Sequence, residues 1–382
     1  MLPASKHLVW CEVDTSILAQ NLAALRLRTG PGVLIAPAVK ANAYGHGIGV
    51  ASHAFLAGGA DWLCVHSVEE AHFLRTHGFE CPILVVGYVA RWELAEVRAL
   101  GCRMVVYNRE IVEEARHLPP GPPLRVHIKL ETGNNRQGLL LEEALSLAAE
   151  MVTVPALELE GLSTHFANVE DTTDHEFATR QLRRFEEGVS AFRAAGYAVP
   201  VCHVANSAAT LLWSHSHKAL VRPGIACYGM WPSPETLVST VLGGQAPLPL
   251  KPALTWKSRV AQLKPISSGE FVGYGCTYMA THSTRLAIVP VGYYDGYDRR
   301  LSNLAHVLVR GHRAPVRGRV CMDFIMVDVT DIPEVGLEDE VVLLGRQGDE
   351  RISAEQLGNW MGTINYEVTT RIGAHIPRVA VG

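Results

Sequence analysis

Between residues 33 and 223, short apolar runs alternate with amphipathic stretches, and this alternation limits the possible folds more than any other feature of the chain. Such alternation is typical of βαβ units, which assemble into a parallel sheet. Eight strands in about 220 residues predict an α/β fold with a (β/α)8 barrel of the TIM type, and a doubly wound open sheet is the alternative. The expected strands are residues 33–40, 61–65, 82–86, 103–107, 124–130, 158–163, 200–204 and 219–223.

Two of the intervening helices carry clear end signals. Ser67 and Glu70 have the spacing of a capping box, and Gly78 marks the end of that helix. The longest helix is predicted over about 174–195, where aromatic and aliphatic side chains recur at near-helical spacing before Gly196.

The character of the sequence changes near residue 243. The segment GGQAPLPLKP (243–252) is rich in proline and glycine and is typical of a linker. Beyond it, β-branched runs are separated by glycine, proline and aspartate, and helical signal is confined to about 353–361. We therefore expect a barrel domain over residues 1–242 and a smaller, mostly β domain over residues 243–382.

Composition excludes several classes of protein. A formal net charge of −4 without basic clusters argues against a nucleic-acid partner. No apolar run is long enough for a membrane span, and the N-terminal stretch lacks the apolar core of a leader peptide. The eight cysteines are scattered without a CxxC pair, so we expect neither a disulfide framework nor a metal site. This cysteine usage indicates a reducing cytoplasm.

The run VLIAPAVK ends at Lys40, and a turn rich in glycine and aromatic residues follows. A lysine at the tip of a buried strand is removed from bulk water, which favours the neutral, nucleophilic amine. A lysine that reaches out to solvent is the simpler interpretation. Asn42, Tyr44 and His46 crowd the same turn, and their polar groups suit an anionic ligand.

Other polar residues also fall at predicted strand ends, which is where barrel enzymes carry their chemistry. Each has an ordinary explanation: Lys129 and Arg222 could form ion pairs, Ser207 could cap a helix and His165 could be a satisfied interior histidine. Their concentration at one rim is stronger evidence for a site than any single residue. The set comprises Lys40, Lys129, Arg136, His165, Asn206, Ser207, Arg222, Gly224 and Ile225. The loops after the last two strands are the usual phosphate site of such barrels.

The β domain carries a second group of motifs: FVGYGCTY (271–278), VGYYDGYDRR (291–300), VRGRVCMDFIMVDV (316–329) and GTINYEVTTRIGAHIPR (363–378). Tyrosines and glycines in β loops are often packing and turn residues. Tyr274 stands between two glycines, so its side chain is free of neighbouring bulk and could project into a cleft.

These motifs, from AVKANAYGHG at Lys40 to Arg378, resemble those of the bacterial alanine racemases in order and spacing over nearly the whole chain. The resemblance implies a cofactor, pyridoxal 5'-phosphate, bound as an aldimine to Lys40, and a head-to-tail homodimer in which Tyr274 reaches the partner's cofactor as the second catalytic acid/base. It implies that Arg222 meets the pyridine nitrogen with His165 behind it. It further implies cofactor contacts from Tyr44, Asn206, Ser207, Gly224, Ile225 and Tyr366, and substrate contacts from Arg136 and the backbone of Met322. Lys129 would be carbamylated and would brace Arg136.

Three positions depart from the family pattern. Glu131 stands where the family usually has aspartate, Asn134 where it has methionine, and Tyr294 where it has a small residue. None of them is assigned to the chemistry, but two lie in the loop that carries Arg136.

The function that the resemblance implies is interconversion of L-alanine and D-alanine, an isomerase reaction that supplies D-alanine for peptidoglycan. Removal of an α-proton on one face and its return on the other requires two acid/base groups, here Lys40 and Tyr274. The alternatives are a racemase of another small amino acid such as serine, a barrel-type pyridoxal-phosphate decarboxylase, a non-catalytic cofactor-binding protein and a cofactor-free Schiff-base aldolase.

Overall fold

The structure is a computed structural model that describes residues 6–382, so the first five positions of the N-terminal stretch inspected for a leader lie outside the described residues. The chain divides into two compact units. The barrel unit consists of Ile17–Ala41 and Ala51–Pro252, and the β unit consists of Met1–Ser16, Asn42–Val50 and Ala253–Gly382.

All eight predicted strands are present in the barrel unit. Six of them form a parallel sheet in the order β3-β4-β5-β6-β7-β8, and β2 pairs with β9 in parallel. Half of them, β3, β4, β8 and β9, are fully buried, as expected of strands covered on both faces. Their bounds are β2 Leu34–Ile35, β3 Leu63–Val65, β4 Ile83–Val85, β5 Arg103–Val106, β6 Leu124–Lys129, β7 Leu157–Ser163, β8 Val201–His203 and β9 Leu220–Val221.

Contacts at both edges of this sheet close it into a ring. A parallel bridge joins Ala38, beyond β2, to Cys64 in β3. On the other side, the Ala219 amide donates to the Cys202 carbonyl at 3.1 Å and the Arg222 amide donates to the Ala205 carbonyl at 2.9 Å. The predicted barrel is therefore confirmed, and the doubly wound open sheet is wrong.

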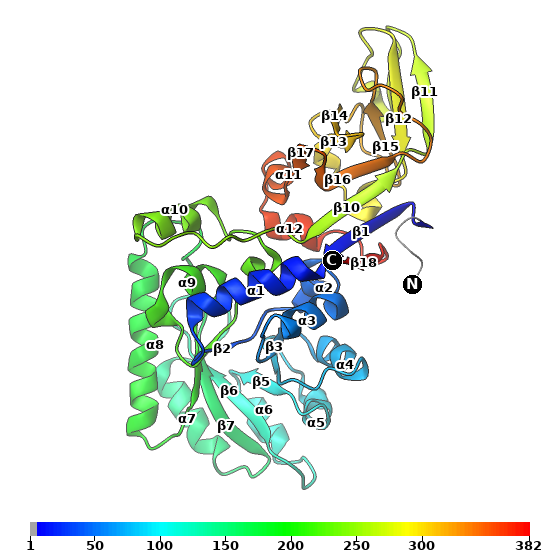
Figure 1. Cartoon of the computed structure of the whole chain (residues 1–382). Helices are drawn as coiled ribbons and strands as arrows, with labels where there is room; N and C mark the ends of the chain where they lie inside the picture. The colour runs from blue at the N-terminus through cyan, green and yellow to red at the C-terminus, as the bar shows by residue number, and fades with distance from the viewer. Residues whose placement is uncertain (1–5) are drawn as a thin grey trace. The chain divides into compact units, whose positions relative to one another are not determined.

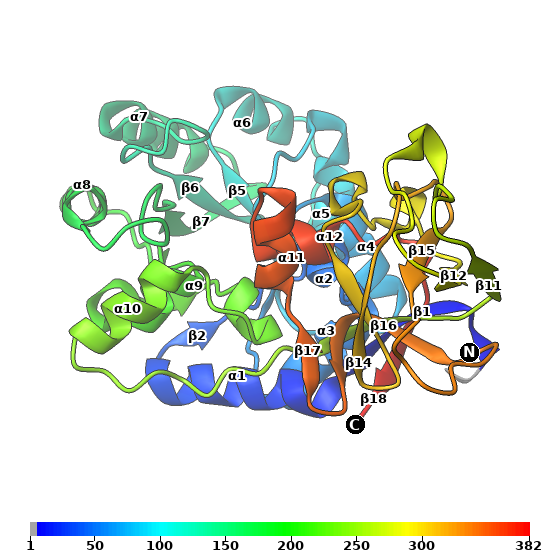
Figure 2. The ribbon, with the colours of Figure 1, turned by 90° about the horizontal axis from the view of Figure 1, so that it is seen from above.

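Helices separate the strands, and α6, α7 and α8 lie outside β5, β6 and β7 (Figures 1 and 2). The longest, α8 (Glu176–Ala194), lies within the predicted range and buries Leu182, Phe185 and Phe192 along one face. Ser67 caps α4, since its Oγ accepts from the Glu70 amide at 3.3 Å. The others are α1 Thr15–Thr29, α3 Ile48–Ala57, α4 Val68–Thr76, α5 Leu94–Ala99, α6 Arg109–Ala115, α7 Leu141–Met151, α9 Ser207–Leu212 and α10 Pro234–Leu242.

The β unit contains one sheet in the order β14-β13-β16-β10-β1-β18, with β17 paired to β16, and a three-stranded sheet β11-β12-β15. The helix predicted near 353–361 is α11 (Ala354–Met361), and α12 (Asn365–Thr370) follows it. The strands are β1 Val9–Asp14, β10 Leu254–Arg259, β11 Gln262–Ile266, β12 Thr284–Val289, β13 His306–Val309, β14 His312–Pro315, β15 Ile325–Asp328, β16 Glu340–Gln347, β17 Glu350–Ile352 and β18 Arg378–Val381.

The first strand of the chain groups with the C-terminal part, whereas the sequence boundary at residue 242 assigned it to the barrel. β1 pairs antiparallel with β10 and parallel with β18. Trp10, Cys11 and Val13 are buried in this arrangement. A short N-terminal strand carries no sequence signal for its partners, which lie more than 240 residues away along the chain.

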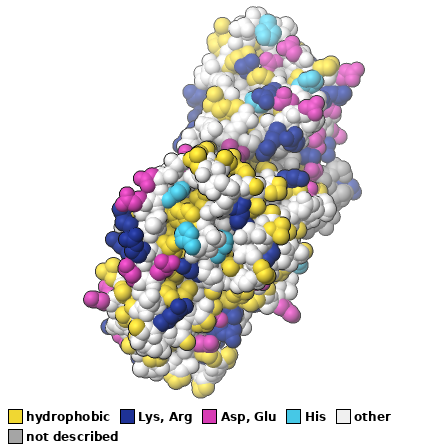
Figure 3. All heavy atoms as spheres, turned by 60° about the vertical axis from the view of Figure 1, so that its left-hand side comes forward, with side chains coloured by type: hydrophobic (Ala, Val, Ile, Leu, Met, Phe, Trp, Pro, Cys, Tyr) yellow, Lys and Arg dark blue, Asp and Glu magenta, His cyan; other side chains and the backbone are white. Residues whose placement is uncertain are grey.

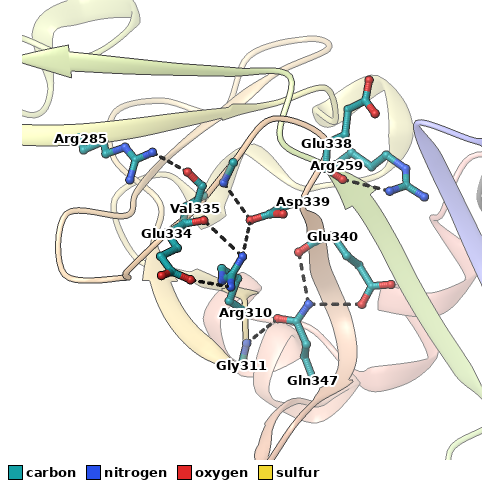
Figure 4. A network of polar contacts seen from close by, with 11 residues as sticks. Arg259, Arg285, Arg310, Gly311, Glu334, Val335, Glu338, Asp339, Glu340 and Gln347 are labelled. Atoms are coloured by element: carbon teal, nitrogen blue, oxygen red, sulfur yellow. Dashed lines mark hydrogen bonds and ion pairs between the residues drawn. The ribbon is translucent and has the colours of Figure 1, made fainter.

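Arginines hold the loop between β15 and β16 in the β unit (Figure 4). Arg259 donates to the Glu338 carbonyl at 3.0 Å, Arg285 to the Val335 carbonyl and Arg310 to the Glu334 carbonyl at 3.2 Å. These side chains come from three other segments and satisfy carbonyls of this loop.

The outer surface mixes charges of both signs. On the face shown in Figure 3, acidic and basic side chains are interspersed and form no large block of one sign. In the described part of the chain, no helix has both the length and the apolar character needed to span a membrane.

Two glycines of the barrel unit provide a matched test of packing. Gly196 and Gly229 both have φ of +86°, but only at Gly229 would a Cβ meet another atom, the Lys251 carbonyl oxygen at 1.7 Å. We expect Gly196→Ala to cost about 1–2 kcal/mol from its left-handed backbone alone. Gly229→Ala should cost more than about 4 kcal/mol, because the backbone of residue 251 must also move.

Urea denaturation followed by far-ultraviolet circular dichroism compares the two variants. A much larger fall in the midpoint for Gly229→Ala supports the packing described for the barrel unit. Equal shifts for the two variants would contradict it.

Candidate active site

The carboxyl ends of the barrel strands bring several of the predicted residues to one rim. Lys129 is the last residue of β6, His165 follows β7 by two positions and Arg222 follows β9 directly. Lys40 follows the Ala38 bridge. Arg222, Arg136 and Lys40 all lower the pKa of Lys129, which places these four cationic side chains in one electrostatic environment.

The turn after Lys40 has an unusual backbone. Lys40–Tyr44 forms the short helix α2, and φ is +55° at Ala41, +51° at Asn42, +55° at Ala43 and +52° at Tyr44. This is one left-handed turn without glycine, a conformation that costs about 1–2 kcal/mol per residue. The prediction of a strand through Lys40 is therefore wrong: β2 ends at Ile35, and Lys40 begins the turn.

Glu70 of α4 holds the start of this turn. Its Oε1 accepts from the Ala41 amide and its Oε2 accepts from the His66 amide, both at 2.7 Å. The predicted capping box is half right, because Ser67 caps the helix while the Glu70 carboxylate leaves the cap to bind Ala41. Charge-assisted hydrogen bonds of this length are the strong ones, and they help to fix a strained backbone beside Lys40.

Lys129 is buried and its amine is easily deprotonated. Its Nζ donates to Gln137 Oε1 at 3.0 Å, and Gln137 Nε2 donates to the Tyr107 hydroxyl at 2.9 Å. Burial, with Arg222 and Arg136 nearby, lowers the pKa of Lys129 to about 8. A neutral amine is therefore accessible near neutral pH.

Arg222 is held by two groups of the barrel unit. Its guanidinium donates to His203 Nδ1 and to the Thr164 carbonyl, the latter at 3.0 Å. Burial lowers its pKa to about 10, so it stays charged at neutral pH. Within residues 6–382, Arg222 makes no hydrogen bond to His165. Burial and the Arg222 charge hold the pKa of His165 well below its usual range, so this imidazole is neutral.

The loops after β8 and β9 are joined through Ser207. Asn206 caps α9, since its Oδ1 accepts from the Ala209 amide at 3.0 Å. Ser207 is buried, and its Oγ accepts from the amides of Gly224 and Ala226 at 2.8 and 3.3 Å. The interpretation of Ser207 as a simple helix cap is therefore wrong. With both amides bound to its oxygen, Ser207 keeps its own hydroxyl proton for a further acceptor.

Ile225 lies next to this serine bridge. It is fully buried and begins the short 3-10 helix η4 (Ile225–Tyr228).

Two predicted phosphate-binding tyrosines are neighbours within the β unit. The ring centroids of Tyr44 and Tyr366 are 6.1 Å apart, and Tyr366 lies on α12. The Gly45 carbonyl, directly after Tyr44, accepts from Arg378 Nε at 2.9 Å. Arg378, the last residue of the motif at 363–378, therefore binds the backbone directly after Tyr44.

Tyr274 and Met322 are exposed residues of the β unit in the single chain. Tyr274 begins η5 (Tyr274–Cys276), between Gly273 and Gly275, whose φ values are +70° and +72°. Its side chain is exposed to solvent in the single chain. Apolar residues near these two in sequence are also exposed: Phe271 is 57%, Tyr274 71%, Met279 49%, Met322 54% and Phe324 45% accessible.

The residues that depart from the family pattern stabilise loops. Glu131 accepts from the amides of Gly133 and Asn135, the latter at 2.8 Å, and Asn134 Nδ2 donates to the Phe166 carbonyl at 3.3 Å. Tyr294 stacks on His375, with ring centroids 4.6 Å apart. The first two fix the backbone that leads to Arg136, which is itself exposed.

The donor set of the barrel rim fits an anionic cofactor with an aromatic ring nitrogen. Three cationic side chains, Arg222, Arg136 and Lys40, lower the pKa of Lys129, and one carboxylate, Glu131, raises it, so the surroundings of this amine carry a net positive charge. Ser207 offers a hydroxyl for a phosphate, and Arg222 can only donate, as a ring nitrogen with a free lone pair requires. No cluster of three metal-binding side chains occurs among the described residues.

Four polar residues that support the site were not predicted from the sequence. Glu70 was assigned only to a helix cap. His127, Glu160 and His203 lie inside apolar strands, and each contacts another member of the set or Arg222. The available signal was a charged or titratable residue in an otherwise buried strand, which needs a partner to be stable there.

Known proteins resemble the chain over both units. Residues 13–232 match the family described as "Alanine racemase, N-terminal domain", and residues 253–380 match "Alanine racemase, C-terminal domain". An alanine racemase of Symbiobacterium thermophilum is 42% identical over 373 residues, covering 97% of this chain and 96% of the relative. One of Syntrophobacter fumaroxidans is 41% identical, with 95% of each chain covered.

Solved structures agree with these sequence matches. Alanine racemase from Bacillus anthracis superposes with a TM-score of 0.92 at 34% identity, covering 98% of this chain and 95% of that one. The enzyme from Streptomyces coelicolor gives a TM-score of 0.89 at 35% identity, with 99% of each chain covered. The match of both domains and the full-length similarity place this chain in the alanine racemase family.

Proposed function

We propose that this protein interconverts L-alanine and D-alanine with pyridoxal 5'-phosphate as its cofactor. The observation that carries the proposal is the gathering of Lys40, Lys129 and Arg222 at one rim of the barrel, with a buried serine on the neighbouring loops. Membership of the alanine racemase family gives the reaction. The cationic rim suits both a phosphate and the carboxylate of an amino acid.

The cofactor contacts would divide between an amine, a phosphate cradle and a ring-nitrogen donor. Lys40 would supply the amine that bonds to the cofactor aldehyde. Arg222 would donate to the ring nitrogen, near the neutral His165. The phosphate cradle would comprise Tyr44, Asn206, Ser207, Gly224, Ile225 and Tyr366. When bound, the cofactor withdraws electrons from the substrate and makes the α-proton removable.

Racemisation needs two acid/base groups on opposite faces of the substrate. Lys40 would serve one face and the Tyr274 phenol the other. Because Tyr274 is exposed among apolar residues of the β unit, it suits a position over the barrel of a second subunit. In this proposal, residues 1–242 form the barrel domain that carries the cofactor lysine, and residues 243–382 form the β domain that contributes the second catalytic tyrosine. Two chains would form a head-to-tail homodimer.

The remaining roles concern the substrate and its surroundings. Arg136 and the backbone of Met322 would bind the substrate carboxylate, and a carbamate on Lys129 would brace Arg136. Arg222 is a poor proton donor, so the ring nitrogen would stay unprotonated, which moderates electron withdrawal and favours proton return over side reactions. The enzyme would act in the cytoplasm and supply D-alanine for peptidoglycan.

Borohydride reduction tests the cofactor assignment. The purified protein should be yellow, and reduction should fix the cofactor on Lys40, as read by peptide mass spectrometry. Lys40→Ala should lose the label, and unlabelled wild-type protein should racemise L-alanine with a higher kcat/KM than L-serine. Label on Lys129 would contradict the assignment of the cofactor lysine. Comparable kcat/KM values for L-alanine and L-serine would contradict alanine as the preferred substrate.

The low pKa of Lys129 generates a prediction about its carbamate. The neutral amine adds CO₂ and releases one proton, so the modified fraction should rise with pH as the amine loses its proton around pH 8. In ¹³C-bicarbonate, a carbamate carbon signal should appear by NMR and should be absent from Lys129→Ala. A signal that persists in this variant would assign the modification to another amine.

Mixed dimers test whether Tyr274 serves the partner subunit. Tyr274→Phe alone should keep the yellow colour and lose roughly 10²–10⁴-fold in rate, the range for one acid/base group. Mixing equal amounts of Lys40→Ala and Tyr274→Phe chains should restore up to roughly a quarter of wild-type activity. About half of the dimers are then mixed, and one of the two sites in each mixed dimer is intact. Tyr278→Phe, four residues away, is the matched control for the loop and should remain active. Flat activity after demonstrated subunit exchange would contradict the arrangement.

A further inference from the structure

Two histidines on neighbouring strands connect Arg222 to a carboxylate on β7 of the barrel unit. Arg222 donates to His203 Nδ1, at the end of β8. His203 Nε2 lies 2.6 Å from His127 Nδ1 on β6, and His127 Nε2 lies 2.9 Å from Glu160 Oε2 on β7. Both histidines are fully buried. We call Glu160, His127 and His203 the imidazole relay.

The two ends of the relay fix the positions of its protons. A guanidinium can only donate, so His203 Nδ1 must be an acceptor and its proton must lie on Nε2. That proton is donated to His127 Nδ1, which leaves the His127 proton on Nε2. Glu160 is a carboxylate and can only accept, so it receives the last hydrogen bond. Every donor in the chain therefore points from Arg222 toward Glu160.

Surrounding charges favour this neutral arrangement of the two rings. Burial and the Arg222 charge hold the pKa of His203 well below its usual range, and burial lowers the pKa of His127. Glu160 is kept ionised: burial raises its pKa, but the bonds from His127 and Arg103 outweigh burial and lower it overall. Arg103 Nε lies 3.1 Å from Glu160 Oε2, and Arg103 itself stacks over Trp62 at 4.5 Å.

We propose that the imidazole relay positions Arg222: Glu160 holds the His127 proton on Nε2, which leaves His127 Nδ1 to accept from His203 and keeps His203 Nδ1 as the acceptor that orients the guanidinium toward the cofactor. Without an acceptor at position 160, His127 could carry its proton on Nδ1 and would then oppose the His203 proton. His203 would lose its fixed orientation, and Arg222 would keep only the Thr164 carbonyl. The three residues are positioning residues and touch no reacting atom. The inference rests on the proposed function in one respect: that Arg222 contacts the ring nitrogen of the cofactor.

The tautomers can be observed without the cofactor. Protein labelled with ¹⁵N-histidine should show His127 and His203 as neutral rings protonated on Nε2, with signals assigned by comparison with His127→Gln and His203→Gln. An Nδ1 proton or a doubly protonated ring at either position near neutral pH would overturn the relay. This result does not depend on whether the protein racemises alanine.

Three substitutions on β7 test the link to Arg222. Glu160→Leu should weaken pyridoxal-phosphate binding by about tenfold or more, since a buried donor loses a charged acceptor. Glu160→Gln offers an amide oxygen at the same place and should restore most of the affinity and both tautomers. Glu158→Leu is the matched control: Glu158 lies on the same strand, is about half exposed and pairs with the equally exposed Arg125, so affinity should not change.

The proposal is wrong if Glu160→Leu binds the cofactor as tightly as Glu158→Leu, or if Glu160→Gln is as weak as Glu160→Leu while both fold. Absence of cofactor binding in the wild-type protein would instead contradict the proposed function. The ¹⁵N-histidine tautomers would then be the test of the imidazole relay.

Discussion

Mutual repulsion among the cationic side chains at the barrel rim is the interaction on which the rest of the site depends. Removal of charge from water is costly, and like charges add to the cost. The protein responds by lowering the pKa of Lys129 to about 8 and keeping His165 and His203 neutral around Arg222. An anionic ligand relieves this repulsion, so the same arrangement that destabilises the empty rim favours phosphate and carboxylate binding. The opposing carboxylate of Glu160 lies two imidazole rings away from Arg222, which leaves the rim cationic.

Much of the fold could be predicted because it follows from local patterns. Hydrophobic periodicity and composition predicted the eight barrel strands, α8 and α11, because a buried strand or an amphipathic helix has a recognisable pattern of apolar residues within ten or twenty positions. Lys129, Arg222 and Ser207 could be placed at the barrel rim because each stands at or after the carboxyl end of a predicted strand, where barrel enzymes carry their chemistry. The residue roles drawn from the family resemblance stay predictions.

The parts that could not be predicted depend on partners distant in sequence. The left-handed turn from Ala41 to Tyr44 contains no glycine, so the sequence gives no sign of its positive φ values. Glu70 fixes this turn in part, although its position in the sequence indicated only a helix cap. The contact between Arg222 and His203 could not be predicted because it depends on strand register, which spacing does not give. The pairing of β1 with β10 and β18 was hidden for the same reason.

The central claim is that Lys40 and Tyr274, which belong to different units of the fold, each serve one face of the substrate. Exchange of the alanine α-proton with deuterium oxide, followed by NMR on each enantiomer separately, tests it most directly. In Tyr274→Phe, exchange from L-alanine should slow far more than exchange from D-alanine, because Lys40 still serves the second enantiomer. Equal slowing for both enantiomers would contradict the assignment of one base to each face.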